Sequence, residues 1–182
     1  MNTQTDGPYV NTAKLRTLKK KSLKSSNRGP GDTIGGIVID SSGTISICTS
    51  SGGHWLKPPG RVGSSAIRGA GFDFKTNETE IFCALASGHG ENIIEQRICG
   101  RTVKKLKRDG FIPDVNKFLK YNTEWDLGLI SVSYDCQSRK GSVNIIQTSD
   151  AFLYGFVSTK AQKSVIQYSQ KGEGNKYVQS GF

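Results

Sequence analysis

The first patterned segment of the chain alternates apolar and polar residues with the period of a β-strand. It predicts a strand, a three-residue turn and a returning strand at residues 33–40, 41–43 and 44–51. If the turn centres on Ser42, antiparallel pairing places Thr33 directly opposite Ser51. Two hydroxyl side chains are therefore expected at the open end of this hairpin, which is a common cross-strand pair.

Beyond the hairpin, the apolar spacing changes from strand-like to helical and back. It predicts a strand, two helices and three strands at residues 80–87, 91–108, 111–121, 127–134, 141–149 and 152–159. The first helix is expected to turn Ile94, Ile98, Val103 and Leu106 to one side. The last dozen residues, rich in Gln, Lys and Gly, are expected to be loose. This order of elements predicts an α+β fold that corresponds to one half of a layered αββα sandwich.

Residues 1–32 differ from the rest of the chain in having almost no large apolar side chains and seven Lys or Arg against two Asp. They are expected to be a disordered basic segment, and residues 33–182 to form the folded region. The basic run at residues 14–28 fits a nuclear import signal that binds an import receptor, and it equally fits a solvated linker. Nucleic-acid binding is less favoured, because Tyr9 is the only aromatic residue near these lysines.

The composition narrows the class of protein. A chain of 182 residues with 35% hydrophobic content can bury one globular core. No stretch approaches the ~18 apolar residues that a membrane helix needs, and no apolar signal-peptide core is present, so a nuclear or cytoplasmic location is expected. The four scattered cysteines are expected to be small buried hydrophobes. Two distant histidines, His54 and His89, are too few for a metal site, and no cofactor is expected.

Four spaced motifs carry a resemblance to a known family: DTIGG, SSGG, KPPGRVG and SGHGEN. They resemble the signatures of the asparaginase-type N-terminal nucleophile hydrolases. Within that group, SSGG, KPPGRVGSSAIRGAGF and SGHGEN are most similar to the threonine aspartases, or taspases. The resemblance implies an αββα sandwich in which this chain supplies the nucleophile-bearing half. It also implies an α-subunit segment that completes the sheets, a dimer, and an exposed apolar sheet face when that segment is absent.

A threonine hydroxyl becomes a useful nucleophile only when a base accepts its proton. The α-amine of an N-terminal threonine can be that base, since a free α-amine titrates near ~7.7–8.0. Here the amine exists only after the bond between Asp32 and Thr33 is cut. The resulting hypothesis is autocleavage at this bond, and the resemblance makes Thr33 the catalytic nucleophile.

The resemblance also implies roles for other residues of the motifs. Ser51 would orient Thr33, while Ser87 and the N–H of Gly88 would stabilise the oxyanion where a strand gives way to a helix N-terminus. Arg61 would bind the substrate carboxylate, and Gly90 would line the same pocket. Without the neighbouring motifs, Arg61 would be interpreted as a surface ion pair and Ser87 as a helix cap.

One position departs from part of the family. Members that act on free asparagine or isoaspartyl compounds carry an Asp after GRVG, which pairs with the ammonium group of the substrate; this chain has Ser64. The neutral residue favours a threonine-type endopeptidase that cuts protein substrates after Asp, with Asp32 as its first substrate. The alternatives are a small-molecule asparaginase, isoaspartyl or glycosylasparaginase amidohydrolase, and an inactive fragment that acts as a basic binding module.

Overall fold

The structure is a computed structural model that describes residues 33–51, 59–110, 112, 115–119, 125–158, 163–173 and 177–181. The chain divides into two units, residues 1–30 and residues 31–182. The predicted basic segment, with its run at residues 14–28, lies outside the described residues, as does Asp32. All of the described residues belong to the second unit.

This unit contains nine described strands and four short or medium helices. The strands are β1 Thr33–Ile39, β2 Ile45–Ser51, β3 Phe72–Thr76, β4 Glu80–Gly88, β5 Leu127–Asp135, β6 Lys140–Gln147, β7 Ala151–Ser158, β8 Lys163–Gln170 and β9 Val178–Gly181. The helices are η1 Ser64–Ala66, α2 Gly90–Gln96, α3 Ile98–Asp109 and α4 Val115–Phe118. The predicted α+β class is confirmed.

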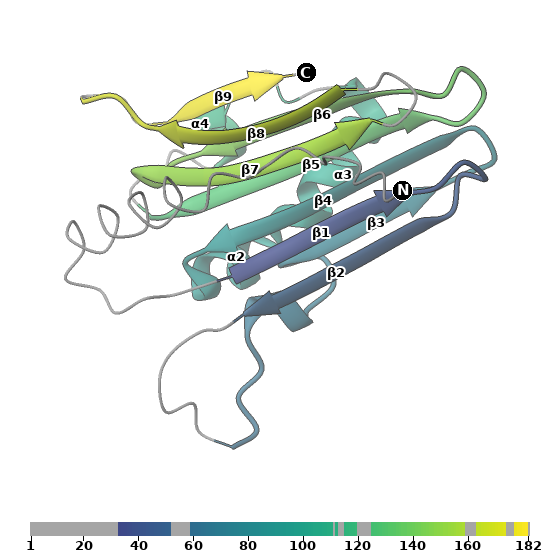
Figure 1. Ribbon diagram of the computed structural model, residues 1–182. Helices are drawn as coiled ribbons and strands as arrows, with labels where there is room; N and C mark the ends of the chain where they lie inside the picture. Colours follow the sequence, from purple (N-terminus) through teal and green to yellow (C-terminus); the bar gives the residue numbers. More distant parts are fainter. Residues whose placement is uncertain are drawn as a thin grey trace, which may run out of the picture. The chain divides into compact units, whose positions relative to one another are not determined.

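The strands form three antiparallel sheets. One has five strands in the order β3-β4-β5-β6-β9, and the others are the hairpins β1-β2 and β7-β8. Figure 1 shows α2 and α3 behind the five-stranded sheet and both hairpins in front of it. The described layers are therefore helices, a central sheet and a layer of two hairpins.

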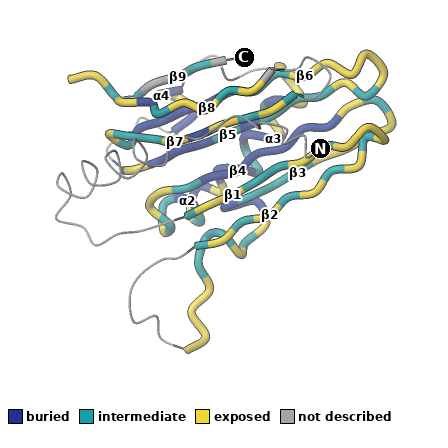
Figure 2. The backbone as a smooth tube through the Cα atoms, viewed as in Figure 1, coloured by how far each residue is buried: buried dark blue, intermediate teal, exposed yellow. Residues whose placement is uncertain are grey.

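The main core lies between the helices and the central sheet, as the buried segments in Figure 2 show. Strand β4 turns Phe82, Ala84 and Ala86 toward this core, because successive side chains of a strand point to opposite faces. From α3, the core receives Ile98, Cys99, Val103 and Leu106, all at most 1% exposed. The predicted apolar side of this helix is confirmed.

Close backbone contacts seat the two hairpins on the opposite face of the sheet. A side-chain carbon at Gly35 of β1 would lie 3.0 Å from Leu85 Cδ1 on β4. On the other side, the ring of Phe152 on β7 occupies the space above Gly128 of β5, so any side chain at Gly128 would overlap it. Each hairpin thus approaches the central sheet at a position where one of the two strands has a glycine.

The predicted helix at residues 91–108 is instead two helices, and this prediction was wrong at one position. Arg97 adopts a left-handed conformation with φ of 47° and separates α2 from α3. The break lets the first amides of α3 donate to loop carbonyls, from Cys99 N to Ala70 O at 3.3 Å and from Gly100 N to Gly69 O at 2.9 Å. These bonds satisfy helix N–H groups that have no partner inside the helix.

Other predicted boundaries also differ from the structure. Within the described part of residues 111–121, the helix is limited to α4. Strands β3 and β8 were not predicted, and the tail expected to be loose contains β9, which pairs with β6. Strands β4, β5, β6 and β7 were predicted with small differences at their ends.

The predicted register of the first hairpin is confirmed, since Thr33 pairs with Ser51. The turn is held by the Asp40 carboxylate, whose Oδ1 accepts hydrogen bonds from Ser42 Oγ, Ser42 N and Thr44 N at 2.6, 2.8 and 2.9 Å. These bonds, the Ser42 hydroxyl foremost, hold the pKa of Asp40 below its ordinary value.

We expect Asp40→Ala to weaken the β1-β2 hairpin, because the turn loses its acceptor for two backbone amides. The folded pKa is lowered, so the contribution of the carboxylate is present at neutral pH and is lost as the pH falls through the lowered pKa. Amide hydrogen exchange at Ser42 and Thr44 measures both effects. Asp40→Asn keeps the Oδ1 acceptor and should retain protection without the acid dependence; equal loss in both variants would contradict this role.

Candidate active site

The open end of the β1-β2 hairpin brings together Thr33 and Ser51, both half-buried. Thr33 is the first residue of β1, so its side chain is held by the ladder and not by a loop. The residue that precedes it lies outside the described residues. The structure thus places the predicted nucleophile on a rigid element beside its predicted orienting hydroxyl.

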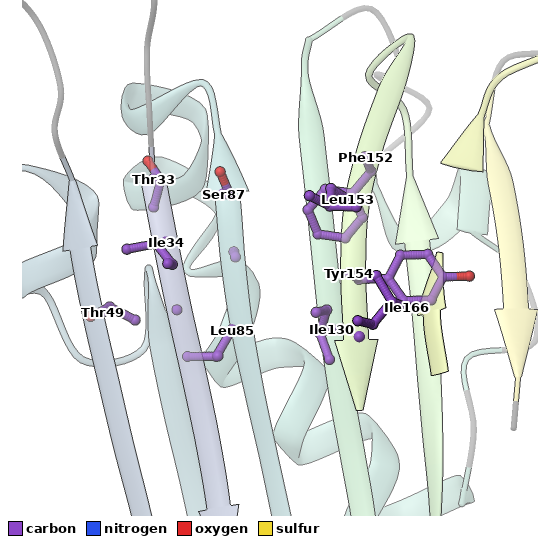
Figure 3. A pocket seen from close by; sticks show the side chains of 14 residues that line it. Thr33, Ile34, Thr49, Leu85, Ser87, Ile130, Phe152, Leu153, Tyr154 and Ile166 are labelled. Atoms are coloured by element: carbon purple, nitrogen blue, oxygen red, sulfur yellow. The ribbon is translucent and has the colours of Figure 1, made fainter. Parts of the chain in front are cut away.

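A cavity of about 320 Å³ lies between the two hairpins. It is lined by Thr33, Ile34, Gly35, Thr49, Leu85, Ala86, Ser87, Gly128, Ile130, Phe152, Leu153, Tyr154, Gly155 and Ile166. Figure 3 shows Thr33 and Ser87 at the same end of this cavity, on neighbouring strands, with the side chains of β7 and β8 across from them. Two predicted catalytic hydroxyls therefore share one site.

The end of β4 carries the predicted oxyanion donor. His89 N donates to Asp126 O at 2.8 Å. Hydrogen-bonded pairs alternate along an antiparallel ladder, so the preceding amide, of Gly88, points away from β5. Gly88 has φ of 142°, and a side chain there would overlap the carbonyl oxygen of Asp126. Position 88, which carries the predicted oxyanion donor, therefore requires glycine.

A second cluster joins the predicted substrate-binding residues. Arg61 Nη2 lies 3.5 Å from Glu91 Oε1, with the two side chains 35% and 66% exposed. Ser64 Oγ lies 3.4 Å from where a side-chain carbon of Gly90 would be, so η1 packs against the start of α2. Arg61 thus forms a surface ion pair, as the simpler interpretation of this residue expects. The group that it contacts is a carboxylate, that of Glu91.

Thr49 links this cluster to the cavity. Its hydroxyl donates to Ser65 O at 2.6 Å, and the same residue lines the cavity on β2. Thr49 was not among the predicted site residues, although it lies two positions before Ser51 and so on the same face of the strand. Glu91 was also missed, although it directly follows Gly90 in the motif SGHGEN.

The described part of the cavity lining contains no side chain that is a conventional general base. Of the described residues that line it, none is Asp, Glu, His, Lys or Cys. Cys83, the cysteine of β4, is fully buried, and burial raises the pKa of its thiol to about 12. A base for Thr33 must therefore be a group other than these lining side chains. The α-amine of Thr33 is a candidate, because it is separated from the hydroxyl by only two carbon atoms.

The expectation of buried cysteines is confirmed for Cys83 and Cys99, whereas Cys48 is exposed and Cys136 half-buried.

Across the described ranges, no three His, Cys, Asp or Glu side chains are grouped in a way that could hold a metal ion. The helices of the same ranges include none that is long and apolar enough to cross a bilayer.

Comparison with known proteins gives a consistent set of relatives. The family model described as asparaginase matches residues 2–167. A plant-type L-asparaginase of Pyrobaculum calidifontis is 40% identical over 93 residues, which is 50% of this chain and 30% of that protein. An N(4)-(β-N-acetylglucosaminyl)-L-asparaginase of Elizabethkingia miricola is 32% identical over 166 residues, which is 84% of this chain and 48% of that protein.

A probable isoaspartyl peptidase/L-asparaginase of Drosophila melanogaster is 31% identical over 80 residues, 44% of this chain and 23% of that protein. The chain therefore spans less than half the length of each of these three relatives.

We expect Gly88→Ala to destabilise the protein by roughly 2–4 kcal/mol, because it adds left-handed strain and a clash with Asp126 O. Gly90→Ala is the matched control, two residues away, where the nearest atom is Ser64 Oγ at 3.4 Å and helix propensity favours alanine. Thermal unfolding compares the two variants. Equal stability would show that the end of β4 is not constrained as described.

Proposed function

This chain belongs to the asparaginase family of N-terminal nucleophile hydrolases, and we propose that it acts as a threonine-type hydrolase with Thr33 as its nucleophile. The observation that carries the proposal is the position of Thr33 on β1, paired with Ser51 and facing the cavity that Ser87 also lines. Among the described residues that line this cavity, none offers a carboxylate, imidazole or amine side chain as a base. This is the environment in which an N-terminal α-amine has a function.

The proposed activation step is autocleavage between Asp32 and Thr33. The Thr33 Oγ attacks the carbonyl carbon of Asp32, the hydroxyl proton is passed to the amide nitrogen of Thr33, the C–N bond breaks, and the acyl group moves from nitrogen to oxygen. Water then hydrolyses the ester, leaving a carboxylate on Asp32 and a free amine on Thr33. The same oxygen and amine are then available for substrates.

In the proposed catalytic cycle, the amine of Thr33 accepts the hydroxyl proton as Oγ attacks a substrate carbonyl. Ser51 orients the nucleophile, and Ser87 with the N–H of Gly88 stabilises the oxyanion. The direction of the Gly88 amide, away from β5, is consistent with this role. The proton held by the amine passes to the leaving nitrogen as the substrate C–N bond breaks, and water then hydrolyses the acyl ester and regenerates Thr33.

For the substrate, we favour a polypeptide with Asp before the cleaved bond. The contact of Arg61 with the carboxylate of Glu91 supports this choice, because it is a carboxylate that the guanidinium already meets. A substrate carboxylate would exchange with, or join, that weak and exposed contact. Ser64, next to Gly90, offers no charge to a substrate ammonium group, as expected for a substrate inside a polypeptide.

A small-molecule amidohydrolase is the second candidate, and the names of the relatives favour it. The matched proteins from P. calidifontis and E. miricola are described as an L-asparaginase and a glycosylasparaginase. The two candidates share Thr33 and its chemistry. They differ in the substrate group that lies near Ser64. In a polypeptide this group is an uncharged peptide bond, and in free asparagine it is an ammonium group that needs a charge partner.

The proposal includes partners that depend on residues outside the described ranges. We propose that an import receptor binds residues 14–28 and that the protein acts in the nucleus or cytoplasm. We also propose a dimer, completed by an α-subunit segment of the kind that the resemblance implies. Nucleic acid has no role in this scheme.

The nucleophile is tested by the mass of the purified chain after prolonged incubation, alone and with the α-subunit segment. The unmodified chain should yield fragments 1–32 and 33–182. Thr33→Val should stay whole, because the attacking oxygen is absent, whereas Thr33→Ser should cleave more slowly. An unmodified chain that stays whole under both conditions, or a Thr33→Val chain that is cut at the same bond, would overturn the proposal.

The substrate class is tested at Ser64. In the cleaved enzyme, Ser64→Asp should raise kcat/KM for free L-asparagine relative to an Asp-containing peptide, on the order of tenfold, since it adds a charged hydrogen-bond partner for the ammonium group. Ser64→Asn is the neutral control and should not change this ratio. An unmodified enzyme that already prefers free asparagine would select the second candidate.

A further inference from the structure

Helix α3 carries most of the net charge of the folded region. Its 12 residues include five Lys or Arg and one Asp, a net charge of +4. Residues 33–182 as a whole contain 18 Lys or Arg and 13 Asp or Glu, a net charge of +5. One of the five bases, Arg101, belongs to the fold, since it donates to Gln96 Oε1 at 3.2 Å and lies 4.9 Å from the centre of the Phe118 ring. The other four are available to the surface.

The helical period places these four bases on the side of α3 that is turned away from the core. Five residues on the other side are each at most 1% exposed: Ile98, Cys99, Thr102, Val103 and Leu106. The basic face, as we call it, consists of Lys104, Lys105, Lys107 and Arg108, of which only Lys105 is half-buried. The core lies between α3 and the central sheet, and the two hairpins lie on the other side of that sheet (Figure 1). The basic face and the cavity therefore lie on opposite sides of the sheet.

Only part of this charge is neutralised within the described part of the chain. Asp109 supplies both ion pairs of the basic face, with Lys105 Nζ at 2.6 Å from Oδ2 and Arg108 Nε at 2.7 Å from Oδ1. Among the described residues, neither Lys104 nor Lys107 has an ion-pair or hydrogen-bond partner. Two ammonium groups of the face are thus left to solvent or to another molecule.

The arrangement costs stability in the chain by itself. Residues three and four apart on a helix are neighbours, and like charges at these spacings destabilise it. Lys104 has Lys107 and Arg108 at these spacings. The helix dipole favours cations in the last turn, which explains Lys107 and Arg108 but not Lys104, which precedes that turn. A molecule that brings carboxylates to the face would remove this repulsion.

The five residues KKLKR at positions 104–108 also resemble a linear nuclear import signal. The fold argues against that interpretation, because Leu106 in the middle is only 1% exposed and the whole segment is helical. A receptor that binds consecutive residues cannot reach all five without unfolding α3. What the helix presents is a surface, with Lys104 and Arg108 about 6 Å apart along the axis.

Other charged partners suit this face less well. Helices that enter a DNA groove contact the bases with their N-terminal residues, whereas all four bases of the face lie in the C-terminal half of α3. Among the described residues, the large apolar side chains that are exposed all lie outside α3, so the face offers none for insertion into a membrane or for stacking on bases. A second copy of the chain, with a net charge of +10, would be repelled.

We propose that the basic face of α3 binds an acidic segment of a partner polypeptide, whose carboxylates pair with Lys104 and Lys107 and contact Arg108. Carboxylates about 6–7 Å apart match the face, as on residues four apart in a helix or two apart in an extended segment. The inference does not rest on the proposed chemistry. Because the cavity lies across the central sheet, the bound segment would leave Thr33 accessible.

Lysine footprinting of the full chain tests this inference. An amine-reactive ester is applied with and without a short polyglutamate peptide at low salt, and mass spectrometry gives the labelling of each lysine separately. Labelling of Lys104 and Lys107 should fall roughly threefold or more, because carboxylates cover their ammonium groups. Lys140, exposed at the β5-β6 turn, should change little. Peptide bound at residues 14–28 does not obscure this result, since each site is measured by itself.

Two outcomes of the footprinting would overturn the proposal. The first is unchanged labelling of Lys104 and Lys107 in the presence of the peptide. The second is protection of these lysines by a DNA duplex of equal charge that is as strong as protection by polyglutamate, which would rule out an acidic polypeptide as the preferred partner.

Charge reversal gives a matched comparison. Lys104→Glu with Lys107→Glu changes the net charge as much as Arg139→Glu with Lys140→Glu, at the exposed β5-β6 turn. Lys105 remains in both variants as the reporter. Polyglutamate should no longer protect Lys105 in the first variant and should protect it fully in the second; equal protection in both overturns the proposal. If the first variant fails to fold, Lys104→Glu alone replaces it, because that change adds a favourable pair with Arg108.

Discussion

The register of the β1-β2 hairpin is the constraint on which the candidate site depends. Side chains alternate between the two faces of a strand, so a slip of one residue would move the whole set to the other face. The carboxylate of Asp40 fixes the turn, and the ladder carries that register to Thr33 and Ser51 at the far end. A polar contact at one end of the hairpin thereby determines which hydroxyl faces the cavity at the other.

Glycines then convert two independent hairpins into the walls of one cavity. Gly35 admits Leu85, and Gly128 admits the Phe152 ring, so each hairpin lies close to a central strand where a side chain would hold it away. Gly88 has a related function, because the end of β4 can approach Asp126 only without a side chain. These three contacts bring Thr33, Ser87 and the Gly88 amide to the same end of the sheet.

The spacing of apolar residues and the turn residues predicted those parts of the structure that depend on interactions between residues close in the sequence. The hairpin register, strand β4 and the buried side of α3 follow from period and turn chemistry, and all three are confirmed. The break at Arg97 was not predictable, because it accompanies a pair of hydrogen bonds to a loop about thirty residues earlier. The walls from β7 and β8 were missed for the same reason, since only the tertiary fold brings them to Thr33.

Access of solvent to the cavity affects the candidate nucleophile. A threonine amine can act as a base while its pKa stays near the ordinary ~7.7–8.0, but the oxyanion that forms beside it is stabilised more strongly where water is excluded. In the chain alone, the cavity has open edges and Thr33 is half-buried. A molecule that fills the cavity would exclude water from Ser87 without moving it, because Ser87 belongs to the central sheet. Occupation of the cavity would then complete the environment of the reaction, while β1 and β4 already set the positions of Thr33 and Ser87.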